Sequence, residues 1–429
     1  MKTKGLTLFG NKLATTTAAV IAFLCVSFAS LSISAQNVHG NRPPQSAVSQ
    51  VIADGQLSGD TIVSFVNFYP GSEIFELEGH SALRIRTPQL DVAISYGMFN
   101  FDDPGFVYRF VKGETDYWVG MLPWQPFMAA YGSDGRRIVE HQLNMTPQQK
   151  QRLLQLVDDN LKPENATYRY NYVRDNCATR PLRIVELAMG DSIVLGHPEA
   201  GLDGEMSYRD VMRHYHRNYP WYQFGIDLCL GPGIDYVLDN RQKAFAPVVL
   251  DSQMAGAAVG GRALVARTVV HNDVAADNAV DGATPWYLTP MAVCCLLLAA
   301  AIALTVRDIC RRRVTRWFDS AMFGLYGLLG LMIWYLVLCS QHEATSPNWL
   351  ALWLNPLLLF LAVAVWIKRI QRLVIWCQIA IFAVLLVLIC AWPFTGQSMN
   401  AAFVPMIAAE LIRVANYVYI NRQLLGKKQ

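Results

Sequence analysis

The chain has 429 residues, which is long enough for more than one domain. Hydrophobic residues make up 53% of it and charged residues only 16%, and the apolar excess lies at the extreme N-terminus and in the last third. The formal net charge is +3 and no long basic tract occurs, so nucleic acid is not an expected partner. The composition predicts a membrane protein with a soluble domain.

The N-terminus indicates export. Lys2, Lys4 and Lys12 precede an apolar run that ends near the small residue Ala35. This order is typical of a secretory signal peptide over residues 1–35. The run is long for such a peptide, so an uncleaved anchor helix is the alternative. In either case, the segment 36–285 is expected on the far side of the membrane.

The exported segment alternates strand and helix patterns. Strands are expected over 61–68, 80–86, 91–97, 116–122 and 137–144, and helices over 106–111, 146–161, 181–189 and 207–216. Thr87-Pro88-Gln89 turns the chain between the second and third strands, so these two strands should form a hairpin. Residues 220–285 show no strong period. Together the patterns predict a small α+β domain.

Cys177 is the candidate nucleophile. It follows the turn-forming Arg174-Asp175-Asn176 and precedes an apolar-periodic run that predicts a helix. At a helix N-terminus, unpaired N–H groups and the helix dipole stabilise an anion, so a thiol there becomes a thiolate more readily. Only Cys177 and Cys229 fall in the mature exported segment. A disulfide between them is therefore the alternative.

A nucleophilic cysteine needs a base, and His80 is the best candidate. It opens the strand predicted over 80–86. Among the other histidines, His141, His214 and His216 are expected in surface or core roles, the last two in an exposed basic helix. No metal-ligand spacing occurs in the exported segment, and no cofactor is expected.

The last third predicts a transmembrane domain over residues 286–429. Apolar stretches near the length of about 20 residues that spans a bilayer cover 286–306, 321–340, 349–367, 373–392 and 401–420. Basic residues gather in loops 307–316 and 368–372 and in the tail, which the positive-inside rule places in the cytoplasm. Loops 341–348 and 393–400 contain no Lys or Arg and should face outward. This topology agrees with the export signal.

Polar residues of the last third are candidates for a role near the site. His342, Asn348 and Asn355 lie where the exported domain should meet the bilayer, and they either line the site or cap helices. Glu410 and Arg413 are three residues apart in the last span and able to pair on one face.

Four motifs resemble known sequences. Their order, with histidine before cysteine, is similar to that of the permuted papain-like fold found in the lecithin:retinol acyltransferase group related to NlpC/P60 proteins. More closely, the motifs and the apolar stretches together resemble the lipoprotein N-acyltransferase family Lnb. The motifs are Gly79-His80-Ser81-Ala-Leu-Arg84, Gly113-Glu-Thr-Asp-Tyr117, Asn176-Cys177-Ala-Thr-Arg180 and His342…Asn348…Trp353-Leu-Asn355-Pro356.

The resemblance implies a fold and a location. It predicts an exported α+β domain of permuted papain-like type, followed by an all-α five-helix transmembrane bundle in the bacterial inner membrane, with the catalytic domain in the periplasm. In this fold a group on the neighbouring strand orients the histidine, here Asp91, Ser95 or Tyr96. Period-2 geometry puts Asp91 and Ser95 on one face and Tyr96 on the other, but does not decide which face His80 uses.

The resemblance also implies an activity. Cys177 would take a fatty acyl chain from a phospholipid as a thioester and pass it to the α-amine of a diacylated apolipoprotein. Backbone N–H groups near Cys177, with Asn176, would hold the oxyanion. Ser81, Tyr117 and Arg180 become candidate substrate contacts; Arg180 either binds a phosphate head group or caps its own segment. The alternatives are a membrane-anchored cysteine peptidase or amidase acting on cell-wall peptides, and a non-enzymatic membrane sensor.

Overall fold

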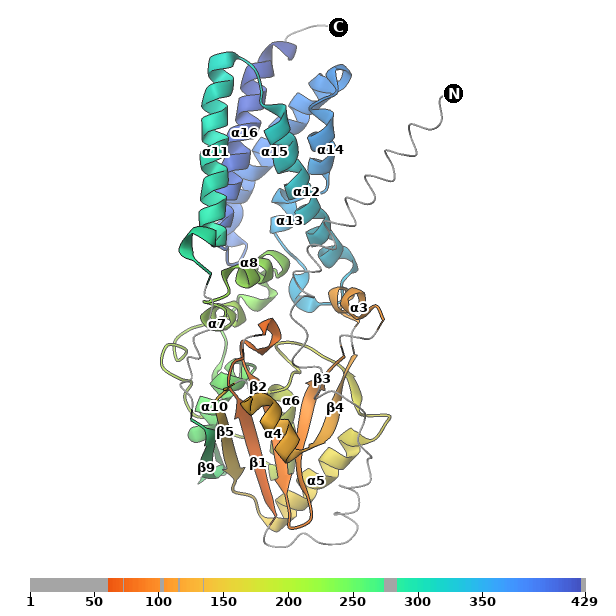
Figure 1. Ribbon diagram of the computed structural model, residues 1–429, viewed down its shortest axis with the longest axis vertical. Coiled ribbons are helices and arrows are strands. Elements are labelled where there is room, and N and C mark those ends of the chain that lie inside the picture. The colour runs from red at the N-terminus through yellow and green to blue at the C-terminus, as the bar shows by residue number, and fades with distance from the viewer. Residues whose placement is uncertain are drawn as a thin grey trace.

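The computed structural model describes residues 61–71, 73–100, 104–114, 116–133, 135–273 and 284–425. An α/β part and a helical part are stacked along the long axis of the molecule (Figure 1). The predicted signal peptide, residues 1–35, lies outside the described residues.

An antiparallel sheet forms the centre of the α/β part. Its seven strands are ordered β6-β4-β3-β2-β1-β5-β9. In chain order they are β1 (Ile62–Phe68), β2 (His80–Arg86), β3 (Asp91–Met98), β4 (Asp116–Pro123), β5 (Ile138–Leu143), β6 (Thr167–Arg169) and β9 (Val265–Asn272). A separate pair consists of β7 (Ala258–Val259) and β8 (Arg262–Ala263). The expected hairpin is confirmed, because β2 and β3 pair from Arg86–Asp91 to Ala82–Ser95.

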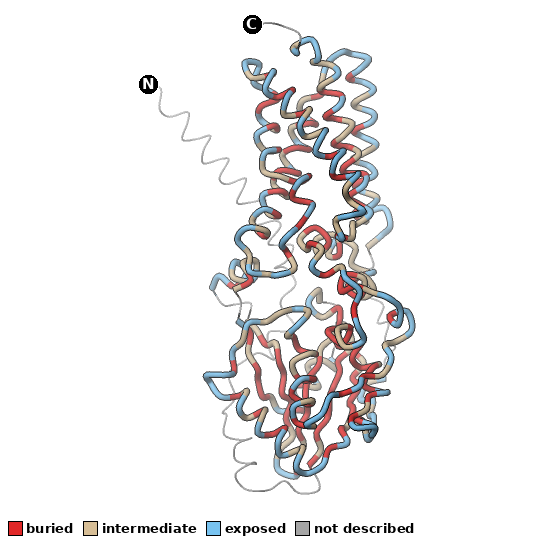
Figure 2. The backbone as a smooth tube through the Cα atoms, turned by 180° about the vertical axis from the view of Figure 1, so that it is seen from behind, coloured by how far each residue is buried: buried red, intermediate tan, exposed pale blue. Residues whose placement is uncertain are grey.

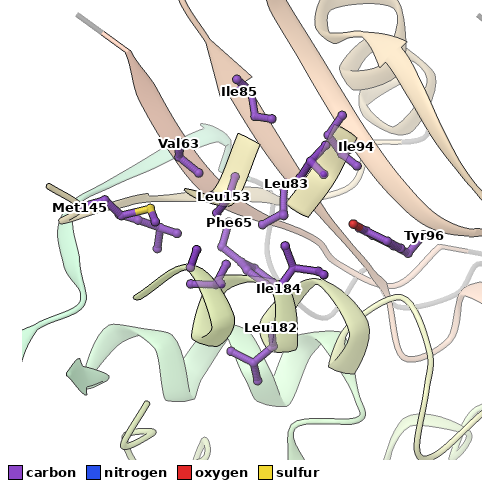
Figure 3. Packing of buried hydrophobic residues seen from close by; sticks show 14 of the residues in the cluster. Val63, Phe65, Leu83, Ile85, Ile94, Tyr96, Met145, Leu153, Leu182 and Ile184 are labelled. Atoms are coloured by element: carbon purple, nitrogen blue, oxygen red, sulfur yellow. The ribbon is translucent and has the colours of Figure 1, made fainter. Parts of the chain in front are cut away.

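The two faces of this sheet are covered by different helices. Alternation along the strands sends Phe65 and Leu83 into the main core, where α5 (Pro147–Leu161) and α6 (Thr179–Met189) pack (Figure 3). The opposite face buries Val66, Ala82 and Ala93 under α4 (Trp124–Gly132). The helix α4 was not predicted, because its short apolar segment carries no clear helical period.

Cap signals that were visible in the sequence set the helix ends. Thr146 accepts a hydrogen bond from the backbone N–H of Gln149, whose side chain accepts from the Thr146 N–H, and Pro147 occupies the first helical position. The helix α6 ends at Gly190, whose φ of 75° suits glycine. The predicted helices at both places are confirmed.

The exported part also contains short helices. They are α3 (Phe106–Lys112), α7 (Tyr208–Tyr215), α8 (Pro220–Cys229), α9 (Asn240–Lys243) and α10 (Pro247–Ala255). The helices α3 and α8 lie next to the membrane bundle, and α10 packs on the sheet (Figure 1). The stretch without a clear period therefore forms α8 to α10 and the edge strand β9.

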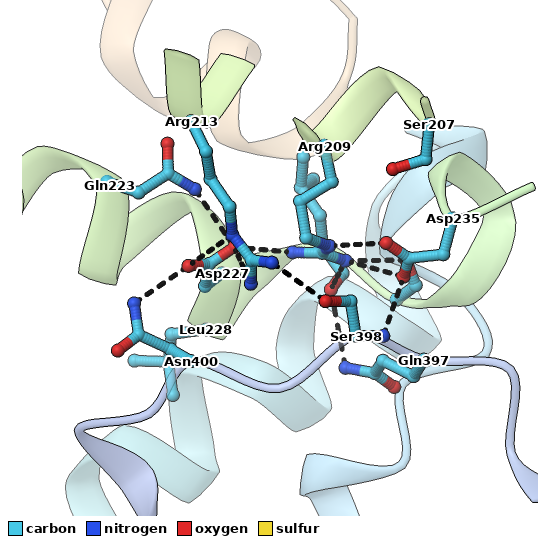
Figure 4. Close-up of polar contacts among 12 residues, drawn as sticks. Ser207, Arg209, Arg213, Gln223, Asp227, Leu228, Asp235, Gln397, Ser398 and Asn400 are labelled. Atoms are coloured by element: carbon cyan, nitrogen blue, oxygen red, sulfur yellow. Dashed lines mark hydrogen bonds and ion pairs between the residues drawn. The ribbon is translucent and has the colours of Figure 1, made fainter. Parts of the chain in front are cut away.

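A buried ionic network joins α7 and α8 to the bundle. Arg209 donates to Asp227 at 3.0 Å and to Asp235 at 2.6 Å (Figure 4). The Asn400 amide donates to Asp227 at 2.7 Å from the loop between the last two bundle helices. The loop 393–400, predicted to face outward, therefore contacts the exported part.

Among the described residues, four helices, all in the bundle, are long and apolar enough to cross a membrane. They are α11 (Pro290–Arg311), α12 (Arg316–Cys339), α15 (Gln371–Ala391) and α16 (Phe403–Asn421). The loops with clustered arginines lie at the end away from the α/β part (Figure 1). Many residues of these helices are exposed (Figure 2). They include the apolar residues Leu296, Leu338 and Val387, as a bilayer-facing surface requires.

The third predicted span is not one continuous helix. It is divided into α13 (Leu350–Trp353) and α14 (Leu357–Ala364). Pro356 lacks a backbone N–H and disfavours helical geometry at Asn355 before it. The Asn355 side chain accepts from the Leu357 N–H at 3.1 Å and donates to the Trp353 carbonyl at 3.2 Å. Asn355 therefore caps both halves of a broken span.

The buried charges of α16 have other partners than expected. Arg413 of α16 donates to Asp319 at 2.6 Å and to Asp308 at 2.8 Å. Glu410 instead accepts from the Trp353 indole at 2.6 Å, and its other oxygen has no hydrogen-bond partner. The expected pair between Glu410 and Arg413 is therefore wrong, because α11 and α12 supply carboxylates that face Arg413.

Candidate active site

Asn176 shapes the turn that carries Cys177. Its amide N–H groups donate to two backbone carbonyls, at 2.7 and 2.8 Å, and its oxygen accepts from the next two N–H groups of the turn, Ala178 and Thr179, at 2.9 and 3.0 Å. Asn176 thus acts as a side-chain cap just before α6. Both of its amide donors are used, so the expectation that this amide holds an oxyanion is wrong.

The Cys177 thiol is buried at the start of α6. Burial raises the pKa of Cys177 to about 11, whereas hydrogen bonds from the Ser81 backbone N–H, the Tyr170 hydroxyl and its own N–H act in the opposite direction. Burial is the largest of these effects, so the resting thiol keeps its proton at neutral pH. A base must remove the proton when the thiol reacts.

His80 begins β2, next to the residue that contacts the thiol. Its neighbour Ser81 directs a backbone N–H at Cys177, so the first turn of α6 and the first residues of β2 meet at this point. The imidazole stacks on Tyr131 of α4, with ring centroids 5.7 Å apart and planes at 3°. The unpredicted helix α4 therefore forms one wall around His80.

Ser95 is the orienting candidate that meets the imidazole. Its Oγ atom lies 2.9 Å from Nε2 of His80. This contact follows from the hairpin register, in which Ser95 pairs with Ala82, two residues along β2. Asp91 lies at the other end of the hairpin and binds Arg84 at 2.7 and 2.8 Å. Tyr96 points into the main core on the opposite face (Figure 3).

A second histidine lies close to the site. His216 was expected on an exposed helix, but it is buried, and its Nε2 atom lies 2.8 Å from Oε1 of Glu78. The Tyr172 hydroxyl donates to the other oxygen of Glu78. Nδ1 of His216 faces the Gln223 carbonyl oxygen at 2.8 Å. Both ring nitrogens of His216 thus have a polar side-chain partner inside the domain.

The sequence offered one signal for this pair. Glu78 directly precedes the Gly79-His80 motif, and its charge acts on Cys177 by raising the pKa of the thiol. A buried carboxylate two residues from a catalytic candidate requires a partner. The identity of that partner could not be read locally, because His216 lies 138 positions away.

Of the candidate substrate contacts, Tyr117 lies near the thiol, whereas Arg180 binds a residue of its own segment. The Tyr117 ring stacks on Tyr170 with centroids 4.5 Å apart, so it lies one ring from Cys177. Arg180 instead binds Asp175 through two hydrogen bonds, at 2.8 and 2.5 Å, and its guanidinium covers the Tyr168 ring. Arg180 therefore ties down its own segment.

The outer-loop candidates connect the two parts of the molecule. His342 lies 2.7 Å from the Phe110 carbonyl oxygen through Nε2, and the Asn348 amide donates to the Leu228 carbonyl at 3.0 Å. The Asn348 oxygen accepts from the Leu350 N–H at 3.0 Å. These two side chains bind the bundle loop to the exported part, while Asn355 caps the broken span.

Cys177 and Cys229 are both free. The expected alternative of a disulfide between them is therefore wrong. That disulfide was the observation that would have supported a non-enzymatic sensor. A buried thiol beside α6, an imidazole at the start of β2 and N–H groups directed at the sulfur thus lie in one region of the domain.

The fold and this site define a multi-pass membrane protein whose periplasmic α/β domain carries a cysteine and a histidine at adjoining element ends. A family model described as the Lnb N-terminal periplasmic domain matches residues 50–216, and one described as the Lnb transmembrane domain matches residues 282–424. Together they span more than half of the chain, which belongs to the Lnb lipoprotein N-acyltransferase family. No curated protein and no solved structure matches the chain.

Proposed function

We propose that this protein transfers a fatty acyl chain from a phospholipid, through a thioester on Cys177, to the α-amine of a diacylglyceryl-cysteine at the N-terminus of an apolipoprotein. One observation carries the proposal. The chain belongs to the Lnb family, and the Cys177 thiol beside α6 accepts a hydrogen bond from the backbone N–H of Ser81, the residue that follows His80. Residues 36–285 would form the catalytic domain and residues 286–429 the membrane domain.

The first half-reaction forms the thioester. His80 accepts the thiol proton while the sulfur atom bonds to the ester carbonyl carbon of the phospholipid. The negative charge moves to the carbonyl oxygen, where the backbone N–H groups of Ser81 and Cys177 are suitable donors. The ester C–O bond then breaks, and the proton passes from His80 to the departing oxygen. Lysophospholipid leaves.

The second half-reaction consumes the thioester. The amine of the lipoprotein attacks the thioester carbonyl carbon, and His80 accepts a proton from the amine nitrogen. The C–S bond breaks, an amide forms, and the sulfur recovers its proton. Ser95 would keep the imidazole in one orientation through both steps, as the hydrogen-bonded partner of a catalytic histidine does.

Burial of the thiol is suited to transfer rather than to hydrolysis. Cys177 is 9% exposed, and α6, β2 and Tyr170 surround it. A thioester at this position has little contact with bulk water, so it persists until an amine arrives. The membrane bundle and its junction give no evident advantage to a peptidase acting on cell-wall fragments, whereas both substrates of the proposed reaction are lipids.

The test is complementation. Expressed in a bacterial strain depleted of its own N-acyltransferase, the chain should yield triacylated lipoproteins, detected by mass spectrometry of N-terminal lipopeptides. Cys177→Ser and His80→Ala should yield diacylated lipopeptides only. Cys229→Ser, which changes the other cysteine of the exported part, is the matched control and should behave as the unaltered chain. Full activity in Cys177→Ser would exclude the thioester route.

A further inference from the structure

The short helix α3 lies at the outer edge of the membrane bundle (Figure 1). Backbone and side-chain bonds attach its last turn to the residues that follow α12. The Gln341 N–H donates to the Lys112 carbonyl at 2.8 Å, and the Ser340 hydroxyl donates to the Val111 carbonyl at 2.9 Å. Since α12 ends at Cys339, α3 is held at the level where a membrane-crossing helix emerges.

Gly113 permits this close attachment. Its φ is 75°, and a Cβ atom at this position would lie 2.9 Å from the backbone nitrogen of His342. Both the backbone conformation and the space therefore require glycine. The contact fixes α3 against the bundle loop, so the orientation of its exposed side is set by the fold.

That exposed side is apolar and aromatic. Val107, Tyr108 and Phe110 are 42, 61 and 47% exposed. Aromatic side chains are favoured at the level of the lipid head groups, where one end of the ring is apolar and the other meets water. Tyr108 lies beside Tyr335 of α12, a helix that is long and apolar enough to cross a membrane. The occupant of this surface is therefore the outer leaflet of the bilayer.

A continuous series of rings leads from α3 to the thiol. We call it the aromatic row, and its members are Phe110, Phe106, Phe99, Tyr117 and Tyr170. Successive ring centroids along the row lie 6.2, 5.7, 5.2 and 4.5 Å apart. The last ring carries the hydroxyl that donates to Cys177.

The aromatic row is most exposed at its bilayer end. Phe110 is 47% exposed there, whereas Phe106 and Tyr117 are only 6 and 7% exposed and Phe99 and Tyr170 are half-buried. The row therefore starts at the exposed side of α3 and ends at the ring beside the nucleophile. A hydrocarbon chain that follows these rings would exchange lipid contacts for ring contacts without crossing water.

We infer that the aromatic row is the path by which an acyl chain of a glycerophospholipid in the outer leaflet brings its ester carbonyl to Cys177. The inference rests on the proposed function, because it names the donor lipid and its route to that site. The occupant is the donor phospholipid rather than the lipoprotein acceptor. The first half-reaction, run without any acceptor, therefore isolates the path.

A crosslinking experiment tests lipid contact without catalysis. The full chain, carrying Cys177→Ser, is placed in nanodiscs of phosphatidylethanolamine with an alkyne-tagged acyl chain, and a benzophenone amino acid replaces Phe110. The control carries the same group at Val270, an exposed apolar residue on β9, away from the bundle (Figure 1). Lipid label on position 110 well above that on position 270 is expected. Equal labelling of the two positions would overturn the inference.

A kinetic experiment tests the route itself. Acylation of Cys177 is measured in Phe110→Asp and in the matched control Val270→Asp, with phospholipid in nanodiscs and with p-nitrophenyl acetate, a short ester soluble in water. We expect Phe110→Asp to slow acylation by phospholipid at least about tenfold, since a charge is unfavourable at a lipid-facing position, and to change acylation by the soluble ester less than about twofold.

The two arms separate the possible failures. An equal loss with both donors would mean that Phe110→Asp damages the site, and an unchanged rate with phospholipid would mean that lipid enters elsewhere; either result overturns the path. If the unaltered chain forms no acyl-enzyme from phospholipid, the proposed function fails. The crosslinking result at position 110 then still decides whether α3 contacts lipid.

Discussion

The imidazole of His80 and the hydroxyl of Ser95 lie 2.9 Å apart on neighbouring strands of the central sheet. A hydrogen bond at one ring nitrogen determines which nitrogen of a histidine exchanges protons. Because Nε2 meets Ser95, Nδ1 is the nitrogen that we expect to exchange a proton with Cys177. Stacking on Tyr131 restricts the ring further. The pair therefore orients the base before substrate arrives.

Ser95→Ala should lower the rate of Cys177 acylation about tenfold, because the imidazole loses the hydrogen bond that orients it while its own chemistry remains. Ser95→Thr, which keeps the hydroxyl, should restore most of the rate. The measurement is single-turnover formation of acyl-enzyme across a range of pH. An unchanged rate and pH profile in Ser95→Ala would show that Ser95 does not position His80.

The reactivity of Cys177 should increase with pH, as expected of a thiol with a raised pKa. Burial raises the pKa of Cys177 to about 11, so the thiolate fraction increases with pH throughout the range below that value. In His80→Ala, where no imidazole assists, alkylation by iodoacetamide should rise about tenfold per pH unit between pH 7 and 10. A plateau near pH 8 would contradict this account.

This measurement needs a control for the other thiols. Cys229→Ser in the same background removes the second cysteine of the exported part, and peptide mass spectrometry assigns the alkylation to position 177. The unaltered chain should react faster than His80→Ala at neutral pH, because the imidazole accepts the thiol proton.

Glu78 and His216 should stabilise the exported part as a pair. Glu78→Gln or His216→Ala alone leaves a buried polar partner unsatisfied, so each should lower the free energy of unfolding by about 3 kcal/mol. The double substitution should cost less than the sum of the two, since the residues are in direct contact. Pulse proteolysis of the full chain in detergent provides the measurement.

Asp159→Asn is the matched control for this cycle. Asp159 forms an exposed pair with Lys162 on the surface, and such pairs contribute little. No measurable change in stability is expected. Strict additivity of the Glu78 and His216 substitutions would mean that the two residues act independently, contrary to their geometry.

Arg209 should be the most sensitive residue of the junction. It is fully buried and binds both Asp227 and Asp235 (Figure 4). Arg209→Ala leaves two carboxylates without their main partner and should cost about 3 to 5 kcal/mol. Arg209→Lys should recover only part of this loss, because a lysine cannot form the two-pronged contact with Asp235.

Limited proteolysis of the chain in detergent tests the junction directly. Arg209→Ala should be cleaved between the two parts faster than the unaltered chain, while the membrane helices stay protected. Asn400→Ala removes only one neutral donor to Asp227 and should have a smaller effect. Equal resistance of Arg209→Ala and the unaltered chain would contradict the role of the network.

Local patterns were sufficient for much of the fold. The hairpin of β2 and β3 follows from alternation around a proline turn, and α5 follows from its period together with the Thr146 capping box. The positions of His80 and Cys177 at element starts are also local properties. The positive-inside rule indicated the same topology as the structure, because loop charge does not depend on packing.

Features that depend on distant partners could not be predicted. A hydropathy window registers the composition of residues 349–367 but not the hydrogen bonds that Asn355 satisfies at the break before Pro356. Asn176 was expected to contribute to an oxyanion site, but its amide donates to the Phe245 carbonyl, 69 positions away, a contact that no local pattern reveals. His216 was misassigned for the same reason.

The thiol illustrates how two physical effects compete. Position at a helix start favours a thiolate, and the sequence pattern reveals that position. Burial opposes the charge, and the depth of burial depends on β2 and Tyr170 packing over Cys177. Burial is the larger effect here. The sequence therefore indicated the reactive group, while its ionisation required the structure.

The most direct test of the account is mass spectrometry of the Cys177 peptide after the purified chain is incubated with phospholipid carrying isotope-labelled acyl chains. We predict a labelled, hydroxylamine-sensitive acyl adduct on Cys177. It should disappear when a diacylated lipopeptide is added, and the label should then reside on the lipopeptide amine. Labelled amide formed by Cys177→Ala at the rate of the unaltered chain would contradict the central claim.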